Sequence, residues 1–167
     1  GYYYIASMIG ANIHNFFLAF GGFIFPRVSF RLSSNASVVP LYYMARSLIA
    51  LPGWLITLAL ILFGDPVFTF WLGTKTYLNS INFIKLYLVF EAGMLLIIAP
   101  FYFINGTPHI RLNSLFEIII RLSHFALMLA GYKLFGVNGI VYGLIFSTFL
   151  NIPFQYFLFH LKILQGA

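Results

Sequence analysis

The chain of 167 residues contains no cysteine and few charged residues. Without cysteine, neither a disulfide framework nor a thiolate metal site can form. Charged residues make up 7% of the chain, against about 25% in a soluble globular domain, and so few cannot cover the surface of a water-soluble fold. The composition, 62% of it hydrophobic, therefore excludes a soluble enzyme, a disulfide scaffold and a disordered chain.

Residues that could support catalysis are also scarce. The 3 carboxylates and 4 histidines are spread over different segments, and no pair stands at metal-ligand spacing. No phosphate-binding loop, nucleophile motif or paired carboxylates occur. The 9 lysines and arginines stand singly among apolar runs, unlike the basic clusters of nucleic-acid-binding proteins. We therefore expect no enzyme activity, no metal, no cofactor and no nucleic-acid partner.

Long apolar runs separated by turn residues fill the chain instead. A membrane-spanning helix needs about 20 predominantly apolar residues. Runs such as Leu58–Phe63 do not alternate between apolar and polar residues, as the strands of a membrane β-barrel would. The sequence therefore predicts an all-α, polytopic membrane bundle that forms one lobe over residues 1–167. The five predicted helices are Tyr2–Phe25, Val39–Phe63, Ile81–Ile104, Leu112–Tyr132 and Val137–His160.

The connection at 64–80 is too long for a hairpin turn. Its aromatic stretch Val67–Leu72 predicts a short helix at the membrane interface, with Trp71, Lys75 and Tyr77 at the level of the lipid headgroups.

Loop charge predicts the orientation, because lysine and arginine are enriched in cytoplasmic loops. We expect the loops after the first and third predicted helices to face the cytoplasm and Gly1 to face outward. The lysines and arginines expected on the cytoplasmic side are Arg27, Arg31, Arg111 and Lys162, and those expected on the outer side are Lys75 and Lys133.

Ionisable residues inside the predicted spans are the strongest candidates for function. Each costs about 2.5–3.5 kcal/mol at the bilayer centre on insertion scales, so those present usually face a bundle interior or a wet cavity. Glu91 lies near the middle of the third predicted helix, and Glu117, Arg121 and His124 share one face of the fourth. By depth and face, the cavity candidates are Arg46, Arg121, His124, Lys85, Asn12 and Asn15, and the candidate coupling or structural carboxylates are Glu91 and Glu117.

Each candidate also has a purely structural interpretation. Arg46 and Lys85 would then extend along the helix to the headgroups. Glu117 and Arg121 would form an intrahelical pair that lowers the cost of insertion. Glu91 would pair with a cation, and His14, beside Asn12 and Asn15, would be a hydrogen-bonded interior histidine.

Small residues and prolines add expectations about packing. Pairs of small residues four positions apart allow helices to approach closely. Prolines inside three predicted helices predict kinks, which suit a bundle that changes shape. The small pairs are Ala6 with Gly10 and Gly139 with Gly143, and the prolines are Pro52, Pro100 and Pro153.

Five short motifs follow one another along the chain in a recognisable order. They are Gly1-Tyr2-Tyr3-Tyr4-Ile5-Ala6, Phe25-Pro26-Arg27-Val28-Ser29, Trp71-Leu72-Gly73 with Tyr77, Asn105-Gly106-Thr107-Pro108, and Phe135-Gly136-Val137-Asn138-Gly139. This order resembles bacterial polysaccharide flippases of the Wzx type, which belong to the multidrug/oligosaccharidyl-lipid/polysaccharide exporter superfamily and have a MATE-like fold. The family usually has a Gly-Lys pair in its polar turn; this chain lacks it, and Arg111 is the candidate for the cation.

The resemblance implies a piece of a longer transporter: five of the six helices of one lobe, with the lobe's first helix before Gly1. It implies alternating-access transport of an undecaprenyl-pyrophosphate-linked oligosaccharide, such as an O-antigen unit of lipopolysaccharide, across the bacterial inner membrane. Arg46, Arg121 and Lys85 would line a cationic cavity, where a guanidinium binds phosphate through two parallel hydrogen bonds. Glu91 and Glu117 would couple transport to an ion or proton, or hold the arginines. The implied partners are the lipid-linked oligosaccharide, membrane lipids and the remaining helices.

Three alternatives stay open. A drug or lipid-precursor exporter of the same superfamily would have a smaller cavity with fewer cations and more aromatic residues. A membrane-embedded polysaccharide polymerase or glycosyl-transfer protein would need catalytic residues on a large outward loop. A scaffold subunit would hold its charges at helix contacts without a wet cavity.

Overall fold

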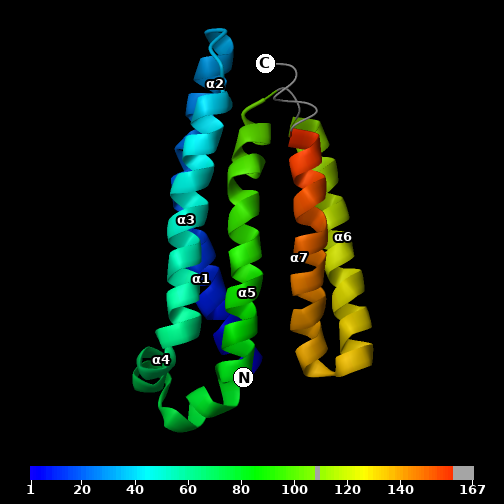
Figure 1. Cartoon of the computed structure of the whole chain (residues 1–167). Coiled ribbons are helices and arrows are strands. Elements are labelled where there is room, and N and C mark those ends of the chain that lie inside the picture. The colour runs from blue at the N-terminus through cyan, green and yellow to red at the C-terminus, as the bar shows by residue number, and fades with distance from the viewer. Residues whose placement is uncertain (108–109, 160–167) are drawn as a thin grey trace.

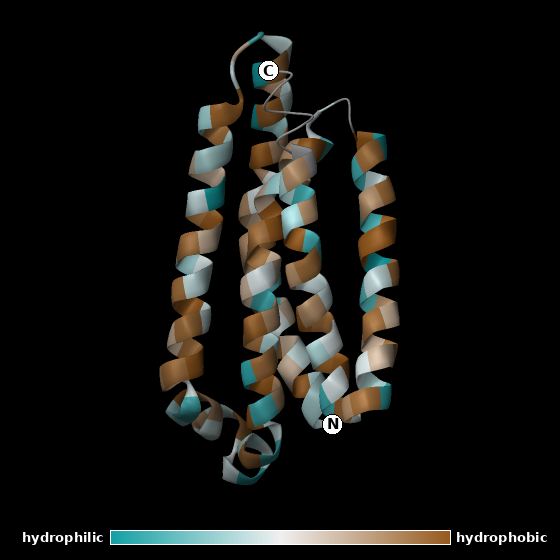
Figure 2. Ribbon diagram, turned by 45° about the vertical axis from the view of Figure 1, so that its right-hand side comes forward, coloured by the Kyte–Doolittle hydropathy of each residue, from teal (hydrophilic) through white to brown (hydrophobic). Residues whose placement is uncertain are grey.

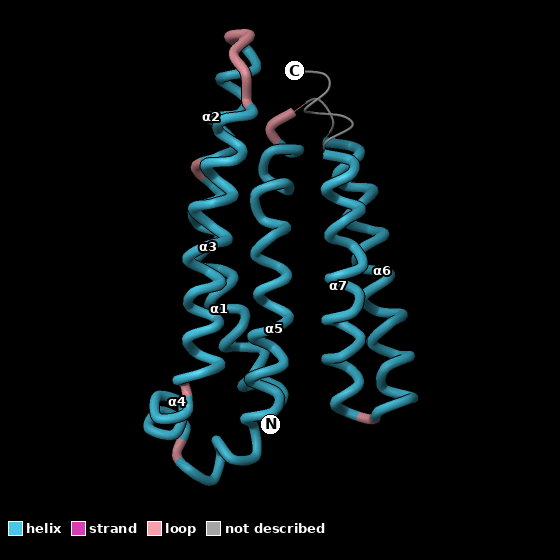
Figure 3. Tube along the Cα trace, viewed as in Figure 1, coloured by secondary structure: helices cyan, strands magenta, loops and turns pink. Residues whose placement is uncertain are grey.

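The computed structural model describes residues 1–107 and 110–159, and these are helical apart from short connections (Figure 3). Pro108, His109, Lys162 and the predicted helix end at His160 lie outside the described residues. The helices in the described part are α1 (Tyr2–Gly22), α2 (Ile24–Ser33), α3 (Val39–Phe63), α4 (Asp65–Leu72), α5 (Thr74–Asn105), α6 (Ile110–Phe135) and α7 (Val137–Phe159).

Five segments are long and apolar enough to cross a membrane, with α1 and α2 together counted as one. Figure 2 shows hydrophobic residues over most of every long helix, with hydrophilic residues scattered between them. Large apolar side chains such as Leu55, Leu134 and Phe146 are exposed on the outer faces, where lipid rather than water would cover them. The prediction of an all-α, multi-pass membrane bundle is confirmed.

Two helix boundaries differ from the predicted ones by more than three residues, and α6 is longer than predicted by two residues at its start and three at its end. The first span does not end at Phe25, because the chain bends at Phe23 and continues as α2 to Ser33. Pro26 lies in the first turn of α2, where a missing backbone N–H costs little. The third span begins at Thr74 rather than Ile81, directly after Gly73, whose φ of 76° is accessible mainly to glycine.

The short helix predicted near 67–72 is present as α4, and a polar contact holds it against the start of α5. The Tyr77 hydroxyl donates to Asp65 Oδ1 at 2.5 Å, and Lys85 Nζ lies 3.6 Å from the same oxygen. Phe68 stacks on the Tyr77 ring. The Tyr77 hydrogen bond and the Lys85 charge hold the pKa of Asp65 below its ordinary value.

Helix α5 is the centre of the bundle. In the most apolar 18-residue stretch of α5, 61% of the residues are buried, whereas 22–39% are buried in the corresponding stretches of the other spans. Helices α1, α3 and α7 pack on it, whereas α6 packs chiefly on α7. In Figure 1, α2 and the end of α5 lie at one end of the bundle, and α4 and the α6–α7 turn lie at the other.

Glycines bring α6 and α7 into backbone contact. A Cβ atom at Gly143 would overlap the carbonyl of Leu127, and one at Gly139 would overlap the carbonyl of Gly131. The small pair Gly139 and Gly143, expected to allow close packing, lies at this contact.

We expect Gly143→Ala to lower the stability of the bundle by about 2 kcal/mol, because overpacking forces the α6 and α7 backbones apart. Thermal unfolding of the detergent-solubilised protein measures this change. Gly22→Ala is the matched control, since a Cβ at Gly22 would meet no atom within 4 Å. Equal melting temperatures for the Gly143→Ala variant and the parent would contradict the close contact.

We expect Tyr77→Phe to increase hydrogen exchange in α4, because it removes the hydrogen bond that fixes Asp65. Since the folded-state pKa of Asp65 is lowered, its contribution is present above the ordinary pKa of aspartate and is lost as the pH falls through the lowered value. As the pH is lowered, the α4 amides of the Tyr77→Phe variant should therefore lose protection from hydrogen exchange at a higher pH than those of the parent. Tyr87→Phe is the matched control: it removes the hydroxyl that donates to Tyr3, and it should leave hydrogen exchange in α4 unchanged.

Candidate functional site

A groove lined in part by the polar side chains His14, Glu117 and Arg121 lies between α1, α5 and α6, and we call it the polar groove. Its inner part encloses about 200 Å³. A wider part of about 540 Å³ continues toward the start of α6 and shares Phe101, Tyr102 and Glu117 with the inner part. The side chains that line the inner part are His14, Leu18, Met94, Ile97, Ile98, Phe101, Tyr102, Glu117 and Arg121.

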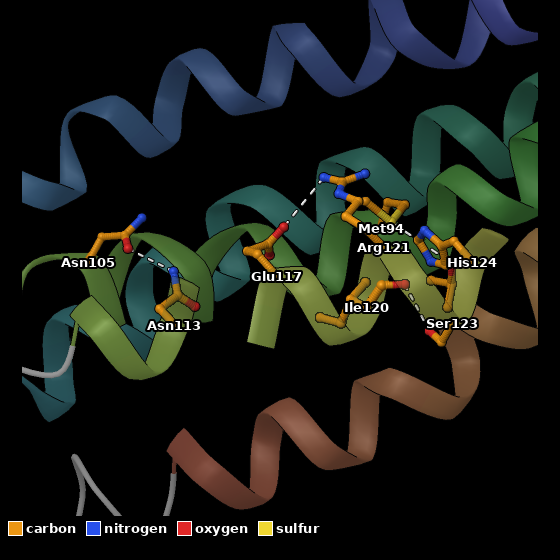
Figure 4. Close-up of polar contacts among 9 residues, drawn as sticks. Met94, Asn105, Asn113, Glu117, Ile120, Arg121, Ser123 and His124 are labelled. Carbon is orange, nitrogen blue, oxygen red and sulfur yellow. Dashed lines mark hydrogen bonds and ion pairs between the residues drawn. The ribbon is translucent and has the colours of Figure 1, made fainter. Parts of the chain in front are cut away.

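Arg121 and Glu117 supply the charge in the groove. Arg121 Nη2 lies 3.5 Å from Glu117 Oε2, one turn away on α6. The Arg121 side chain is 68% exposed and that of Glu117 27%, so the pair is accessible rather than sealed. Figure 4 shows both side chains extending from α6 toward the ribbon of α1 and α2. Arg121 and Glu117 thus form an intrahelical pair, and both side chains line the groove.

Glu91 and His14 form a pair that joins α5 to α1. His14 Nδ1 and Glu91 Oε1 lie 2.8 Å apart and share a hydrogen bond. The Glu91 side chain is 3% exposed, whereas His14 is 24% exposed and lines the groove. A buried carboxylate needs such a partner. Glu91 therefore reaches the groove only through the His14 ring.

Amide and hydroxyl groups line the wider part of the groove. Asn113 Nδ2 donates to Asn105 Oδ1 at 2.7 Å, which ties α6 to the end of α5 (Figure 4). Ser114 and Glu117 lie on the same stretch of α6 and line this part as well. The wider part thus adds amide and hydroxyl groups to the groove, whereas the cationic side chain Arg121 and the imidazole of His14 line the inner part.

His124 is not in the groove, although helical spacing places it on the same face as Glu117 and Arg121. It is buried, its Nε2 lies 3.4 Å from Thr148 Oγ1, and its ring packs edge-on against Phe90. The groove ends at this level, because α7 and α5 cover this turn of α6.

A polar network between α6 and α7 contains residues that the sequence analysis missed. Ser123 Oγ lies 2.9 Å from Ser147 Oγ, and Asn151 Nδ2 donates to Ser123 Oγ at 2.9 Å and to the Ser147 carbonyl at 2.7 Å. Spacing on α7 was an available signal, since Ser147 and Asn151 stand four positions apart on a mostly apolar helix. The network is buried and joins the two helices.

The remaining candidates lie away from the groove. Arg46 is on α3, with its guanidinium 4.7 Å from the centre of the Tyr156 ring on α7. Lys85 pairs with Asp65 at the α4 end. Asn12 and Asn15 are exposed on α1 and are not among the residues that line either part of the groove. The structure thus brings together Arg121, Glu117, His14 and, through His14, Glu91.

The arrangement is suited to binding a polar or anionic group against aromatic walls. It offers a guanidinium, a carboxylate, an imidazole and two amides beside Phe101 and Tyr102. Within residues 1–107 and 110–159, no three His, Asp or Glu side chains are grouped as a metal site would require.

The chain matches no protein-family model, and comparison with curated proteins and with solved structures gives no significant match.

We expect His14→Leu to destabilise the bundle more than Glu91→Leu. Loss of His14 leaves the buried Glu91 unpaired, which costs about 3–5 kcal/mol, whereas loss of Glu91 leaves an imidazole that is partly exposed. The double variant should recover most of the loss. Melting temperatures of the three variants in lipid nanodiscs give the coupling between the residues. Additive losses in the double variant would show that the two side chains do not interact.

Proposed function

We propose that the protein is a membrane transporter of the polysaccharide-flippase type, which moves an undecaprenyl-pyrophosphate-linked oligosaccharide across the bacterial inner membrane by alternating access. The observation that carries the proposal is the accessible Arg121–Glu117 pair in the polar groove, among helices that are otherwise apolar. The order of motifs from Gly1 to Gly139 supports the choice of substrate class.

The physical argument rests on where the charge lies. A guanidinium surrounded by low-dielectric helices attracts a phosphate oxygen more strongly than one in water does. At 3.5 Å, Glu117 holds Arg121 loosely, so a pyrophosphate can displace it and form two parallel hydrogen bonds. The Asn105, Asn113 and Ser114 side chains of the wider part would then face the first sugar.

A second candidate is an exporter of amphipathic drug-like molecules or lipid precursors. Only Arg121 of the three candidate cations lines the groove, since Arg46 and Lys85 lie elsewhere. The walls include Phe25, Phe101 and Tyr102. A narrow, aromatic groove with one cation suits an amphipathic molecule of low charge.

A flipping assay tests the proposal. The protein is reconstituted in vesicles with a fluorescent undecaprenyl-pyrophosphate oligosaccharide, and the fraction of this lipid reached by an external quencher is followed over time. We expect Arg121→Ala to slow flipping about tenfold or more, because one charge-assisted phosphate contact is lost. Arg46→Ala is the matched control and should flip at the parent rate.

The two candidates predict different results. Parent-like flipping by the Arg121→Ala variant would reject the role of the groove in this substrate's path. Absence of oligosaccharide flipping in the parent, together with export of an amphipathic dye that Arg121→Ala impairs, would favour the second candidate.

A further inference from the structure

A second groove lies on another side of α5, between α3, α5 and α7, and we call it the apolar trench. It encloses about 300 Å³ and is lined almost entirely by carbon, with Trp54 and Leu58 from α3, Ala92 and Leu96 from α5, and Phe149 from α7. The Trp54 indole N–H donates to the Ala92 carbonyl at 2.8 Å, so the wall contains no free polar donor there. The trench therefore suits a hydrocarbon chain.

Arg46 lies beyond the α2-side end of this trench. Its guanidinium covers the Tyr156 ring at 4.7 Å, so that it bridges α3 and α7. Arg46 precedes Trp54 by eight residues and Tyr156 follows Phe149 by seven, which places the bridge about 10–12 Å along the helices from the middle of the trench. A cation and an apolar trench thus follow one another along the same pair of helices.

No carboxylate side chain is left to neutralise Arg46. The chain contains three. Asp65 contacts Tyr77 and Lys85, Glu91 contacts His14, and Glu117 contacts Arg121. Among the described residues, the structure gives Arg46 a ring contact but no hydrogen bond, so its N–H groups remain available to an anion.

The position of Arg46 along α3 places this anion near the headgroups. It is the eighth residue of the helix that begins at Val39. Side chains on a helix tilt toward its N-terminus, so the long Arg46 side chain extends toward the α2 end of the bundle. With α3 spanning the bilayer, the end of this side chain would lie near the phosphate groups of one leaflet, and the trench would lie at the level of the acyl chains.

We propose that Arg46 and the apolar trench form a binding site for one anionic glycerophospholipid. The lipid phosphate binds the Arg46 guanidinium above the Tyr156 ring, and one acyl chain lies in the trench against Phe149 and Leu96. Basic pockets between membrane helices bind anionic headgroups in the same way. The site is separate from the polar groove and does not depend on the proposed transport activity.

Charge decides between this occupant and the others. An apolar helix packed over the trench would bury the Arg46 charge without a counter-ion, at a cost of several kcal/mol. A free phosphate would leave the trench unused. A zwitterionic lipid brings its own cation beside the guanidinium. A phospholipid with net negative charge satisfies both the cation and the hydrocarbon surface.

Native mass spectrometry of the protein in a neutral detergent tests the site. Dioleoyl phosphatidylglycerol is titrated against dioleoyl phosphatidylcholine, and the affinity of the first bound lipid is measured. We expect the parent to prefer phosphatidylglycerol about tenfold, and Arg46→Ala to lose that preference. Arg46→Lys keeps the charge and should keep part of the preference, which guards against a folding defect in the alanine variant. Lys85→Ala removes a cation that already contacts Asp65 at the α4 end, so it is the matched control and should bind as the parent does.

Further arms separate the occupants. Dihexanoyl phosphatidylglycerol and glycerol phosphate should compete poorly, because neither fills the trench. The proposal is overturned if Arg46→Ala keeps the parent's preference, if Lys85→Ala loses it equally, or if glycerol phosphate competes as well as the long-chain lipid. It is also overturned if no lipid is retained and Arg46→Ala instead dissociates a dimer, which would identify a second copy as the occupant.

Discussion

The polar chemistry of this bundle depends on a shortage of negative charge. Nine lysines and arginines share three carboxylates, and in apolar surroundings an unpaired charge is costly. Each carboxylate is therefore committed to a contact that also has a structural task. Asp65 holds α4 to α5, Glu91 holds α5 to α1, and Glu117 positions Arg121 in the polar groove. Of the cations without a carboxylate, Arg31 donates to the Ser37 carbonyl and Arg46 covers the Tyr156 ring.

The five spans could be predicted from the sequence, because hydropathy and turn residues are local properties. The boundaries that differ fall where local rules conflict. Pro26 reads as a helix end, but a proline in a first turn also starts a helix, and α2 begins there. The stretch from Thr74 to Ser80 is too polar to be predicted as part of a membrane span from hydropathy alone. In the structure it forms the first turns of α5 and carries Tyr77 toward Asp65.

The candidate site could be predicted only within single helices. Spacing on α6 placed Glu117 and Arg121 together, and they do share the groove. The same spacing predicted that His124 would also line the groove, but His124 is instead buried against Thr148 of α7. The contact between His14 and Glu91 joins residues 77 positions apart, and no pattern along the chain encodes it. Which helices meet, and which faces they cover, depends on long-range packing that periodicity does not contain.

The packing divides the bundle into two parts. Glycine contacts and the Ser123–Ser147–Asn151 network make α6 and α7 one unit, and the His14–Glu91 pair makes α1 and α5 another. These units meet mainly where α7 packs on α5, at the close contact of Gly93 with Thr148.

This boundary lies between the polar groove and the apolar trench. The groove is bounded by α6, which packs closely on α7, and the trench is bounded by α7 itself. A shift of the α6–α7 unit relative to α5 therefore changes the width of both. Proline interrupts the backbone bonding of both helices, at Pro100 in α5 and at Pro153 in α7, and so lowers the cost of bending each helix. The polar groove and the apolar trench thus lie on different sides of α5, and each is closed on one side by a helix of the α6–α7 unit.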